Sequence, residues 1–217
     1  MASDSTASLL FVLAGVNGAG KSSVGGTFLQ EANIDFFNPD EAARSIREAS
    51  GCSIEDANAL AWQEGRRLLE FAIESRMNFA LETTLGGTTI PRLLNEAAAT
   101  GVRVLVWFVG LASPQQHIAR VRARVAAGGH DIPEEMILER WDNSRRNLVL
   151  LMPFLTELRV FDNSQESDPQ AGTIPMPRQL LYCRDGAIVD PPFELLSMTP
   201  EWAKPIVAQA LKLQRRS

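Results

Sequence analysis

The chain has 217 residues, of which 45% are hydrophobic and 22% charged, a composition typical of a globular protein with a sizeable core. Its net charge of −5 argues against the broad basic surface that non-specific nucleic-acid binding needs, and two cysteines, Cys52 and Cys183, are too few for a disulfide framework. The first apolar run is short and no basic segment precedes it, so we expect no signal peptide, no membrane span and a cytoplasmic location.

Apolar runs alternate with helical patterns along most of the chain. In chain order the patterns predict a strand over 8–15, a helix over 20–32, a strand over 34–37, helices from 38 and over 54–76, a strand over 78–84, a helix over about 89–99, a strand over 102–110, helices from 113 and over 133–151, and a strand over 158–164. Asn38 is expected to cap its helix. The apolar stripe of the 54–76 helix is expected to comprise Leu60, Leu68, Leu69 and Ile73.

This alternation predicts an α/β fold, with a parallel sheet that carries helices on both faces. After a loop over 165–178, residues 179–190 predict a hairpin that turns at Asp185-Gly186, and 200–215 predict a last helix. About 40 residues seldom hold a core alone. We therefore expect a single domain over 1–217, with a core over 8–164 and a C-terminal appendage over 178–217.

The stretch GVNGAGKSS, residues 15–23, fits the phosphate-loop pattern G-x-x-x-x-G-K-[ST], follows a predicted strand and opens a predicted helix. In such a loop backbone N–H groups surround phosphate, Lys21 reaches the β- and γ-phosphates, and the Ser22 hydroxyl binds Mg²⁺. We expect ATP and Mg²⁺ as cofactors and a loop at the surface; the alternative is a glycine-rich turn with a solvent-facing lysine. The expected contacts are Gly15, Asn17, Gly18, Ala19, Gly20, Lys21, Ser22 and Ser23.

Missing motifs narrow the class of phosphate-loop protein. The chain has no N-K-x-D motif and no D-x-x-G motif after the second predicted strand, which argues against a GTPase switch. It lacks the transporter signature L-S-G-G-Q, and the strand VLVWFVG ends in glycine where an ordinary ATPase places a carboxylate that orders Mg²⁺. The remaining class is a small-molecule kinase.

Two predicted strands are followed by candidate acceptor-binding residues. Asp40 follows the second strand, at the sheet edge where ligands bind, and can take a proton from an acceptor hydroxyl. Alternatively, an acid in a first helical turn only complements the helix dipole. Glu82 and Thr84 end the strand over 78–84 and can hold a substrate hydroxyl or a water on Mg²⁺, unless they form a solvated strand terminus.

Arginines flank the Gly128-Gly129 pair and suggest a lid over about 120–146. Arg120 and Arg124 are four residues apart and share a helix face, and Arg140 follows beyond the glycines. Such a lid would stabilise charge on a transferring phosphoryl group, whereas the alternative is solvent-facing arginines on an amphipathic helix. Residues 162–164, at the end of the fifth strand, are a candidate surface for adenine.

Taken together, five stretches resemble the zeta-toxin-like P-loop kinases, and among them the chromosomal bacterial branch described as predicted ABC-type ATPases. The stretches are GVNGAGKSS, NPDEAAR, LETTLGG, RVRARVAAGGHDIPEEMILERWDNSRRNL and VFDNS. The resemblance covers about 8–164 and implies a fold like that of nucleoside-monophosphate kinases, with a five-stranded parallel sheet in the order 2-3-1-4-5. It also implies phosphorylation of the sugar 3′-hydroxyl of UDP-N-acetylglucosamine.

The resemblance further implies roles for single residues. Lys21 would hold ATP phosphates, Asp40 would be the general base, and Arg124 and Arg140 would be the lid arginines. The expected substrate contacts are Asp40, Glu82, Thr84 and Arg120. The expected partner is a small-molecule acceptor, with no nucleic acid or membrane; an antitoxin or regulatory protein partner is not visible in the sequence. Two alternatives stay open: a regulatory nucleotide-binding ATPase module, and a kinase of another acceptor such as an antibiotic or a free sugar.

Overall fold

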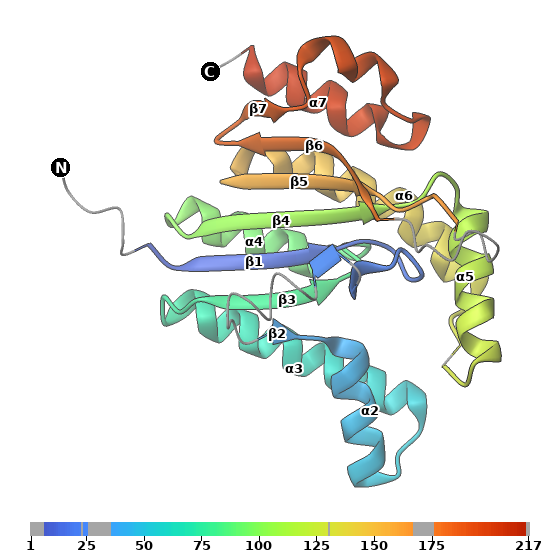
Figure 1. The fold of residues 1–217 in the computed structure, drawn as a ribbon. Helices are drawn as coiled ribbons and strands as arrows, with labels where there is room; N and C mark the ends of the chain where they lie inside the picture. Colours follow the sequence, from blue (N-terminus) through green and yellow to red (C-terminus); the bar gives the residue numbers. More distant parts are fainter. Residues whose placement is uncertain (1–6, 23, 26–35, 130, 167–175, 216–217) are drawn as a thin grey trace.

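The computed structural model describes residues 7–22, 24–25, 36–129, 131–166 and 176–215. Its centre is a seven-stranded sheet in the order β2-β3-β1-β4-β5-β6-β7 (Figure 1). The strands are β1 (Leu9–Ala14), β2 (Phe36–Phe37), β3 (Phe79–Thr83), β4 (Arg103–Gly110), β5 (Glu157–Asp162), β6 (Arg178–Arg184) and β7 (Ala187–Asp190). The first five are parallel, so the expected order 2-3-1-4-5 is confirmed, and β6 and β7 extend that sheet in antiparallel fashion.

The helices follow the expected alternation. They are α2 (Pro39–Ser50), α3 (Ile54–Glu74), α4 (Thr89–Ala99), α5 (Pro114–Ala126), α6 (Glu134–Leu151) and α7 (Lys204–Gln214), with 3₁₀ turns at Met152–Phe154, Phe193–Met198 and Glu201–Ala203. Of the predicted helix over 20–32, residues 21–22 and 24–25 are helical, and 26–32 lie outside the described residues. Positions 34 and 35 of the second predicted strand also lie outside them.

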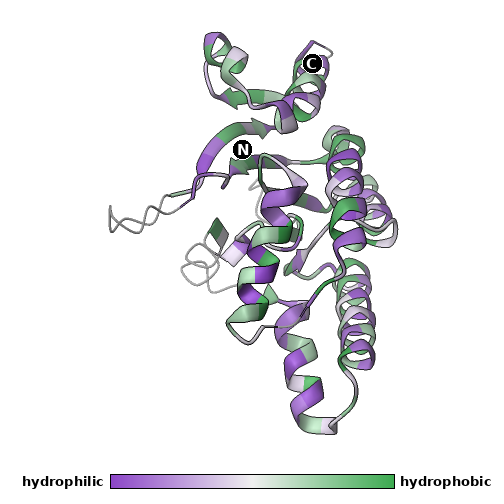
Figure 2. Ribbon diagram, turned by 90° about the vertical axis from the view of Figure 1, so that its right-hand side faces the viewer, coloured by the Kyte–Doolittle hydropathy of each residue, from purple (hydrophilic) through white to green (hydrophobic). Residues whose placement is uncertain are grey.

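The strands separate two apolar layers because successive side chains point to opposite faces of a sheet. Leu10, Val12 and Phe108 face the main core, onto which α3, α4, α6 and α7 pack. Phe11 and Leu13 face the other side, where Val24 packs against them. In Figure 2 hydrophobic and hydrophilic stretches alternate along the helices, as expected for helices with one buried side.

The apolar stripe predicted for α3 is wrong at Leu60, whose side chain is 47% exposed. The buried positions of this helix are Ala57, Ala61, Gly65, Leu69 and Ala72. Small residues occupy the contact because α3 packs closely against α2 through Ala43 and against the ring of Phe37. A Cβ atom at Gly65 would lie 2.5 Å from that ring. Small contact residues of this kind carry little hydrophobic signal in a sequence.

Two helices, α2 and α5, lie beyond the carboxyl ends of the parallel strands (Figure 1). The position of α2 follows from its first residues: the Asn38 side chain accepts hydrogen bonds from the N–H groups of Asp40 and Glu41, and Pro39 occupies the first helical turn. Asn38 therefore caps the helix as predicted. The helix starts directly after β2, which places its first turn at the ligand-binding edge of the sheet.

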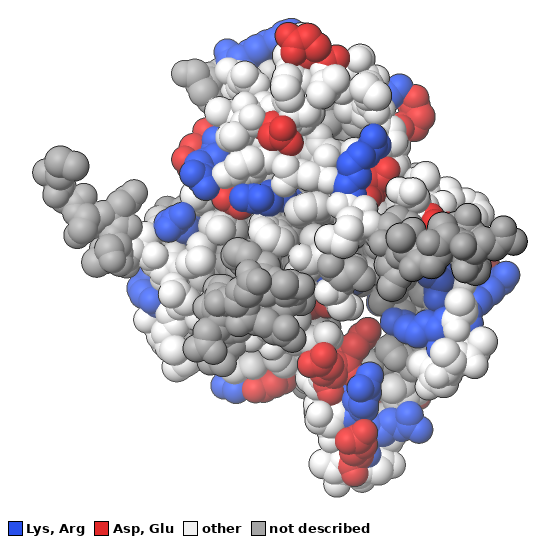
Figure 3. Space-filling model, in the orientation of Figure 1, with Lys and Arg blue, Asp and Glu red and all other residues white. Residues whose placement is uncertain are grey.

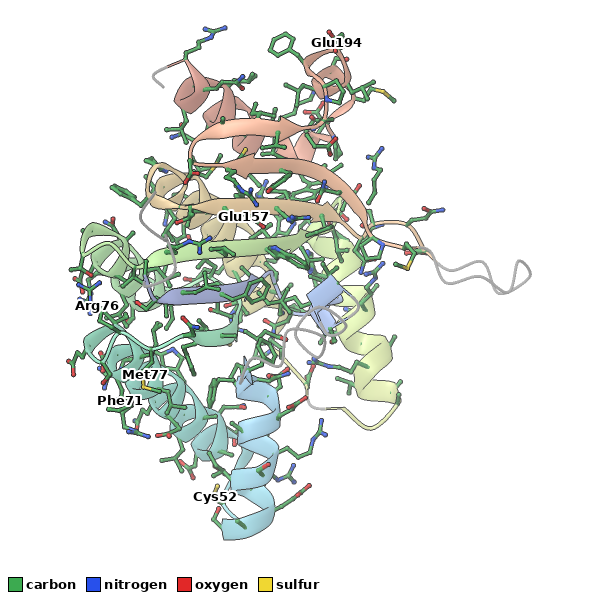
Figure 4. All side chains as sticks on the ribbon, turned by 60° about the vertical axis from the view of Figure 1, so that its left-hand side comes forward. Cys52, Phe71, Arg76, Met77, Glu157 and Glu194 are labelled. Carbon is green, nitrogen blue, oxygen red and sulfur yellow. The ribbon has the colours of Figure 1, made fainter. Side chains whose placement is uncertain are left out.

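The predicted hairpin is confirmed and turns through Asp185 and Gly186, which both have positive φ angles. A buried carboxylate, Glu157 of β5, helps to join it to the sheet (Figure 4). Burial opposes ionisation of this group, but hydrogen bonds from Arg159 and Arg184 outweigh burial and lower its pKa. In the described part of the chain, no helix combines the length and apolar character needed to cross a bilayer.

Candidate active site

The glycine loop connects the end of β1 to the helical residues that begin at Lys21. Gly15 donates its N–H to the carbonyl of Thr83 on the neighbouring strand, and a Cβ atom at Gly15 would lie 2.4 Å from the carbonyl oxygen of Val109. Gly20 has a φ of +81°, and a Cβ atom there would lie 2.4 Å from the amide nitrogen of Asn163. Both positions have positive φ angles that favour glycine, and at Gly15 the backbone carbonyl of Val109 also leaves no room for a side chain.

Asn17 connects this loop to the two helices of the predicted lid, α5 and α6. Its backbone carbonyl oxygen lies 2.9 Å from Nδ1 of His117 on α5, and because a carbonyl can only accept, Nδ1 carries the hydrogen. Its side-chain oxygen accepts a 2.8 Å hydrogen bond from Arg140 on α6. Burial, with smaller contributions from Lys21 and Arg120, lowers the pKa of His117 to about 4, so this histidine is neutral at pH 7.

The end of β5 holds the other side of the loop. The Asn163 side chain donates a 2.8 Å hydrogen bond to the carbonyl of Ala19, and Arg120 donates one of 2.7 Å to the carbonyl of Asn163. Arg120 was expected among the acceptor contacts. The structure places it beside Gly20 and Asn163, on the side of the loop where the sequence suggests adenine. Arg120 is not among the described residues that line the pocket beside Asp40 and Glu82.

Lys21 is buried, with 8% of its side chain exposed. Its ammonium group donates a 2.9 Å hydrogen bond to the carbonyl of Gly15 and lies 3.2 Å from a carboxylate oxygen of Glu82. Glu82 is 13% exposed, so this ion pair is largely shielded from water. The expected surface position is therefore wrong for Lys21. Its side chain is buried and pairs with the carboxylate of Glu82 at the end of β3.

A second ion pair crosses the mouth of the site. Arg124 of α5 lies 3.7 Å from a carboxylate oxygen of Asp40, with the two side chains 36% and 40% exposed. The Asp40 charge also favours the charged form of Arg140, although burial dominates and lowers the pKa of that arginine. In Figure 3 basic atoms gather over α5 and acidic atoms near the start of α2. Asp40 therefore faces the predicted lid arginines across the site.

Beside the phosphate loop lies a pocket of about 540 Å³, large enough for a small molecule. Asn17, Asp40, Glu82, Thr84 and Arg140 all line it. The structure thus brings together residues from the phosphate loop, α2, the end of β3 and α6. Arg124 reaches Asp40 from outside the lining.

The site fits Mg²⁺ through one protein ligand. Ser22 follows Lys21 in the first helical turn, and its side chain is exposed. Within the described ranges, no group of three or more His, Cys, Asp or Glu side chains forms a metal cage. Kinase sites usually hold Mg²⁺ with one or two protein groups, phosphate oxygens and waters, so a single hydroxyl suffices. Ser23, also expected to contact the nucleotide, lies outside the described residues.

Two residues of the site, His117 and Asn147, gave no usable signal in the sequence, and for a third, Asn163, the sequence suggested only a surface for adenine. All three act through hydrogen bonds to backbone carbonyls that are 60 or more positions away in the chain. Asn147 of α6 donates to the carbonyls of Leu85 and Gly87 and so holds the segment after β3. A single polar residue on a helix does not indicate a partner so remote. Only alignment of many related sequences would have revealed them.

Comparisons with known proteins identify the family and the fold. The family model described as Zeta toxin matches residues 2–167. An uncharacterized protein of Haemophilus influenzae is 32% identical over 130 residues, which cover 58% of this chain and 88% of that protein.

Solved structures share the fold. A chain in the crystal structure of AvrRxo1-ORF1:ORF2 with ATP aligns with a TM-score of 0.63 at 16% identity, over 91% of this chain and 65% of that chain. The PezAT chromosomal toxin–antitoxin system of Streptococcus pneumoniae aligns with a TM-score of 0.50 at 15% identity, over 74% of this chain and 70% of that chain. At such identities the likeness concerns the fold alone.

Proposed function

The chain belongs to the zeta toxin family and is a P-loop kinase, and we propose that it transfers the γ-phosphoryl group of ATP to a hydroxyl group of a small molecule. One observation carries this proposal: cations for phosphate and carboxylates for an acceptor meet in one site. Lys21 lies against Glu82, and Arg124 lies against Asp40. A regulatory nucleotide-binding module would need no such carboxylates beside a pocket for a second ligand.

In the proposed reaction the acceptor hydroxyl gives its proton to the Asp40 carboxylate. The hydroxyl oxygen forms a bond to the γ-phosphorus, and the bond between that phosphorus and the β–γ bridging oxygen breaks, so ADP leaves with the electron pair. Lys21, Arg124 and Arg140 stabilise negative charge on the phosphoryl oxygens. Mg²⁺, held through Ser22, would neutralise part of the phosphate charge.

The remaining predicted residues take supporting roles in this proposal. Backbone N–H groups of the loop would hold the β-phosphate, with Gly15, Asn17, Gly18, Ala19 and Gly20 shaping it. Glu82 and Thr84 would orient the acceptor at the end of β3. The proximity of Arg120 to Asn163 supports a role on the adenine side.

The acceptor is a finer part of the proposal. The family resemblance makes UDP-N-acetylglucosamine the reference compound, with free amino sugars and antibiotic hydroxyls as alternatives. Two structural neighbours come from the AvrRxo1-ORF1:ORF2 complex and from the PezAT toxin–antitoxin system, and they motivate a search for an antitoxin partner of this chain.

The test is to incubate the protein with ATP, Mg²⁺ and each candidate acceptor and to identify products by mass. We expect a product 80 Da heavier than the acceptor, as one phosphoryl group adds about that mass, together with one ADP. Slow ATP hydrolysis with no phosphorylated acceptor across the panel would instead favour the regulatory ATPase module.

A further inference from the structure

Two carbonyl groups of the phosphate loop are held by side chains from outside the loop. Nδ1 of His117, on α5, donates a 2.9 Å hydrogen bond to the carbonyl of Asn17, and the Asn163 amide, after β5, donates one of 2.8 Å to the carbonyl of Ala19. We infer that His117 and Asn163 are positioning residues, which aim the N–H groups that follow these two carbonyls at the phosphates of the nucleotide. The inference rests on the proposed function in one respect only: the loop is taken to bind phosphate.

Each of the two bonds fixes the direction of the next N–H group along the chain. A trans peptide unit is planar, and its C=O and N–H groups point in opposite directions. The units that join Asn17 to Gly18 and Ala19 to Gly20 are both trans. A carbonyl that is drawn towards α5 or towards the end of β5 therefore turns the N–H of the following glycine away from that element.

The glycines themselves do not fix this orientation. Glycine adopts positive and negative φ angles about equally readily, so a peptide unit beside it can turn either way. Gly18 and Gly20 have φ angles of +80° and +81°, whereas the φ angle of Ala19 between them is not positive. Such alternation turns successive N–H groups into one concavity, in which anions bind. The bonds from the two positioning residues favour this arrangement over the turned one.

The N–H groups of Gly18 and Gly20 are available to a ligand. Among the residues that the structure describes, neither group donates a hydrogen bond. The N–H of Ala19, in contrast, donates to the carbonyl of Val16 at 3.0 Å, and that of Gly15 donates to Thr83. Phosphate oxygens are the acceptors that suit free N–H groups at this position, where a helix begins.

The burial of His117 supports a role at the loop rather than in packing. The residue is 1% exposed, and within the described ranges its Nε2 atom has no hydrogen-bond partner. Burial of a ring with one unsatisfied nitrogen costs stability that an apolar side chain of similar size would not lose. The bond to Asn17 is what a histidine provides here and a leucine does not.

Asn163 is fixed in place before it reaches the loop. Its N–H donates to the carbonyl of Gly110 at 3.0 Å, and its own carbonyl accepts a 2.7 Å hydrogen bond from Arg120. The side-chain amide that holds Ala19 is therefore anchored to the end of the sheet and to α5. Donors that are already ordered stabilise a charged ligand without the cost of reorganisation.

The effect of His117 can be followed at a single peptide unit. Asn17–Gly18 is the one Asn-Gly pair in the sequence, so ¹³C-carbonyl asparagine with ¹⁵N glycine selects the Gly18 amide in a carbonyl-filtered NMR spectrum. We expect ADP with Mg²⁺ to move this amide proton downfield, as a hydrogen bond to phosphate does, and adenosine not to move it. The shift should be lost in His117→Leu. It should return in His117→Asn, whose amide replaces the Nδ1 donor.

Dissociation constants provide a second readout. The ratio of the Kd for adenosine to the Kd for ADP measures what the phosphates contribute to binding. His117→Leu and Asn163→Leu should each lower this ratio by about tenfold or more, the effect of a lost hydrogen bond to a charged group. His117→Asn should restore it.

Val121→Ala is the matched control for packing. Val121 lies four residues after His117 on α5, is 2% exposed, and would contact a Cβ atom at Gly18 at 3.4 Å. It packs beside the loop but holds no carbonyl. The variant should lose stability and keep both the Kd ratio and the Gly18 shift.

The outcomes separate this inference from the kinase proposal. Wild-type ratios in His117→Leu and Asn163→Leu overturn the inference and leave the kinase standing. A loss in Val121→Ala as large as that in His117→Leu also overturns it, because packing then explains the effect. A Gly18 amide that does not respond to ADP in the wild type overturns it whatever the acceptor. If ADP gives the expected shift and ratios but no acceptor is phosphorylated, the kinase proposal fails and the inference stands.

Asn163→Leu keeps the test open if His117→Leu does not fold. Its Kd ratio, read together with the ADP-dependent shift of Gly18 in the wild type, then decides the inference. An unchanged ratio in Asn163→Leu would overturn it.

Discussion

Arg140 donates a 2.8 Å hydrogen bond to the side-chain oxygen of Asn17, although the two residues are 123 positions apart in the chain. The backbone carbonyl of the same asparagine accepts a hydrogen bond from His117. One residue of the phosphate loop thus contacts both α5 and α6. Movement of either helix would therefore strain or break a hydrogen bond to the loop that is proposed to hold ATP.

Replacement of Arg140 or Arg124 by alanine should lower kcat by about 10²-fold or more, by analogy with other arginines that stabilise transferring phosphoryl groups. The Kd for ATP should change far less, because this charge is needed chiefly in the transition state. Steady-state kinetics and nucleotide titration separate the two effects. Arg122→Ala is the matched control, since Arg122 is exposed and pairs with Glu134 on the neighbouring helix. An unchanged kcat in both test variants would make them ordinary surface arginines.

Replacement of Lys21 by methionine should abolish phosphoryl transfer and also destabilise the protein. The change leaves the carboxylate of Glu82, 13% exposed, without its cation at 3.2 Å. Removing one partner of a shielded ion pair costs up to about 3 kcal/mol. The double variant Lys21→Met with Glu82→Gln should recover much of that stability in urea denaturation and remain inactive. Wild-type ATP turnover in the single variant would contradict the phosphate-loop interpretation.

Asp40→Asn separates the two interpretations of this aspartate. The cap of α2 comes from the Asn38 side chain, so Asp40 contributes to stability chiefly through the helix dipole and an exposed ion pair. Such terms are worth about 1 kcal/mol or less. We expect ATP binding to persist and transfer to fall by about 10²- to 10⁴-fold, as for a lost general base.

Asn38→Ala provides the matched control for Asp40. It should cost about 1 kcal/mol of stability through the lost cap and leave the transfer mechanism in place. Thermal or urea denaturation measures the first effect, and product mass the second. Equal amounts of phosphorylated acceptor from wild type and Asp40→Asn would remove Asp40 from the mechanism.

The stability of the protein should fall in acid because of His117. Its pKa is lowered to about 4 in the folded state, from 6.5, so the unfolded state binds a proton more readily over that range. The stability conferred by the neutral ring is full above pH 6.5 and declines as pH falls towards 4. Between pH 7 and pH 4.5 the free energy of unfolding should drop by about 2 kcal/mol from this group alone.

His117→Asn isolates this effect, because an asparagine amide can replace the Nδ1 donor but does not titrate. The difference between the wild type and this variant in urea denaturation at the two pH values removes the contribution of other groups, including His130. Lys21, Arg120 and Arg145, the cations near the ring, also disfavour its protonation. An identical pH dependence of the two proteins would mean that the ring does not resist protonation.

The sequence was informative where a residue acts on its immediate neighbours. Asn38 and Pro39 indicated the start of α2, and the alternation of elements predicted the parallel sheet. It was uninformative where a contact joins distant segments, as between His117 and Asn17, or where small residues make a contact, as along α3. Lys21 and Glu82 form an ion pair in the structure, but they are far apart in the sequence. Both residues were predicted site residues, yet nothing local indicated that they would pair.

The C-terminal segment has a consequence for how the molecule unfolds. A Cβ atom at Gly110, the last residue of β4, would lie 2.4 Å from the ring of Trp202, and β6 pairs with β5 along its whole length. Loss of residues 176–215 would expose β5 as an open edge and leave the end of β4 uncovered. Amide hydrogens of β4 and β5 should therefore exchange only together with those of β6. We therefore expect the hairpin and α7 to unfold together with β4 and β5, and truncation ahead of β6 to lower the stability of the remaining chain.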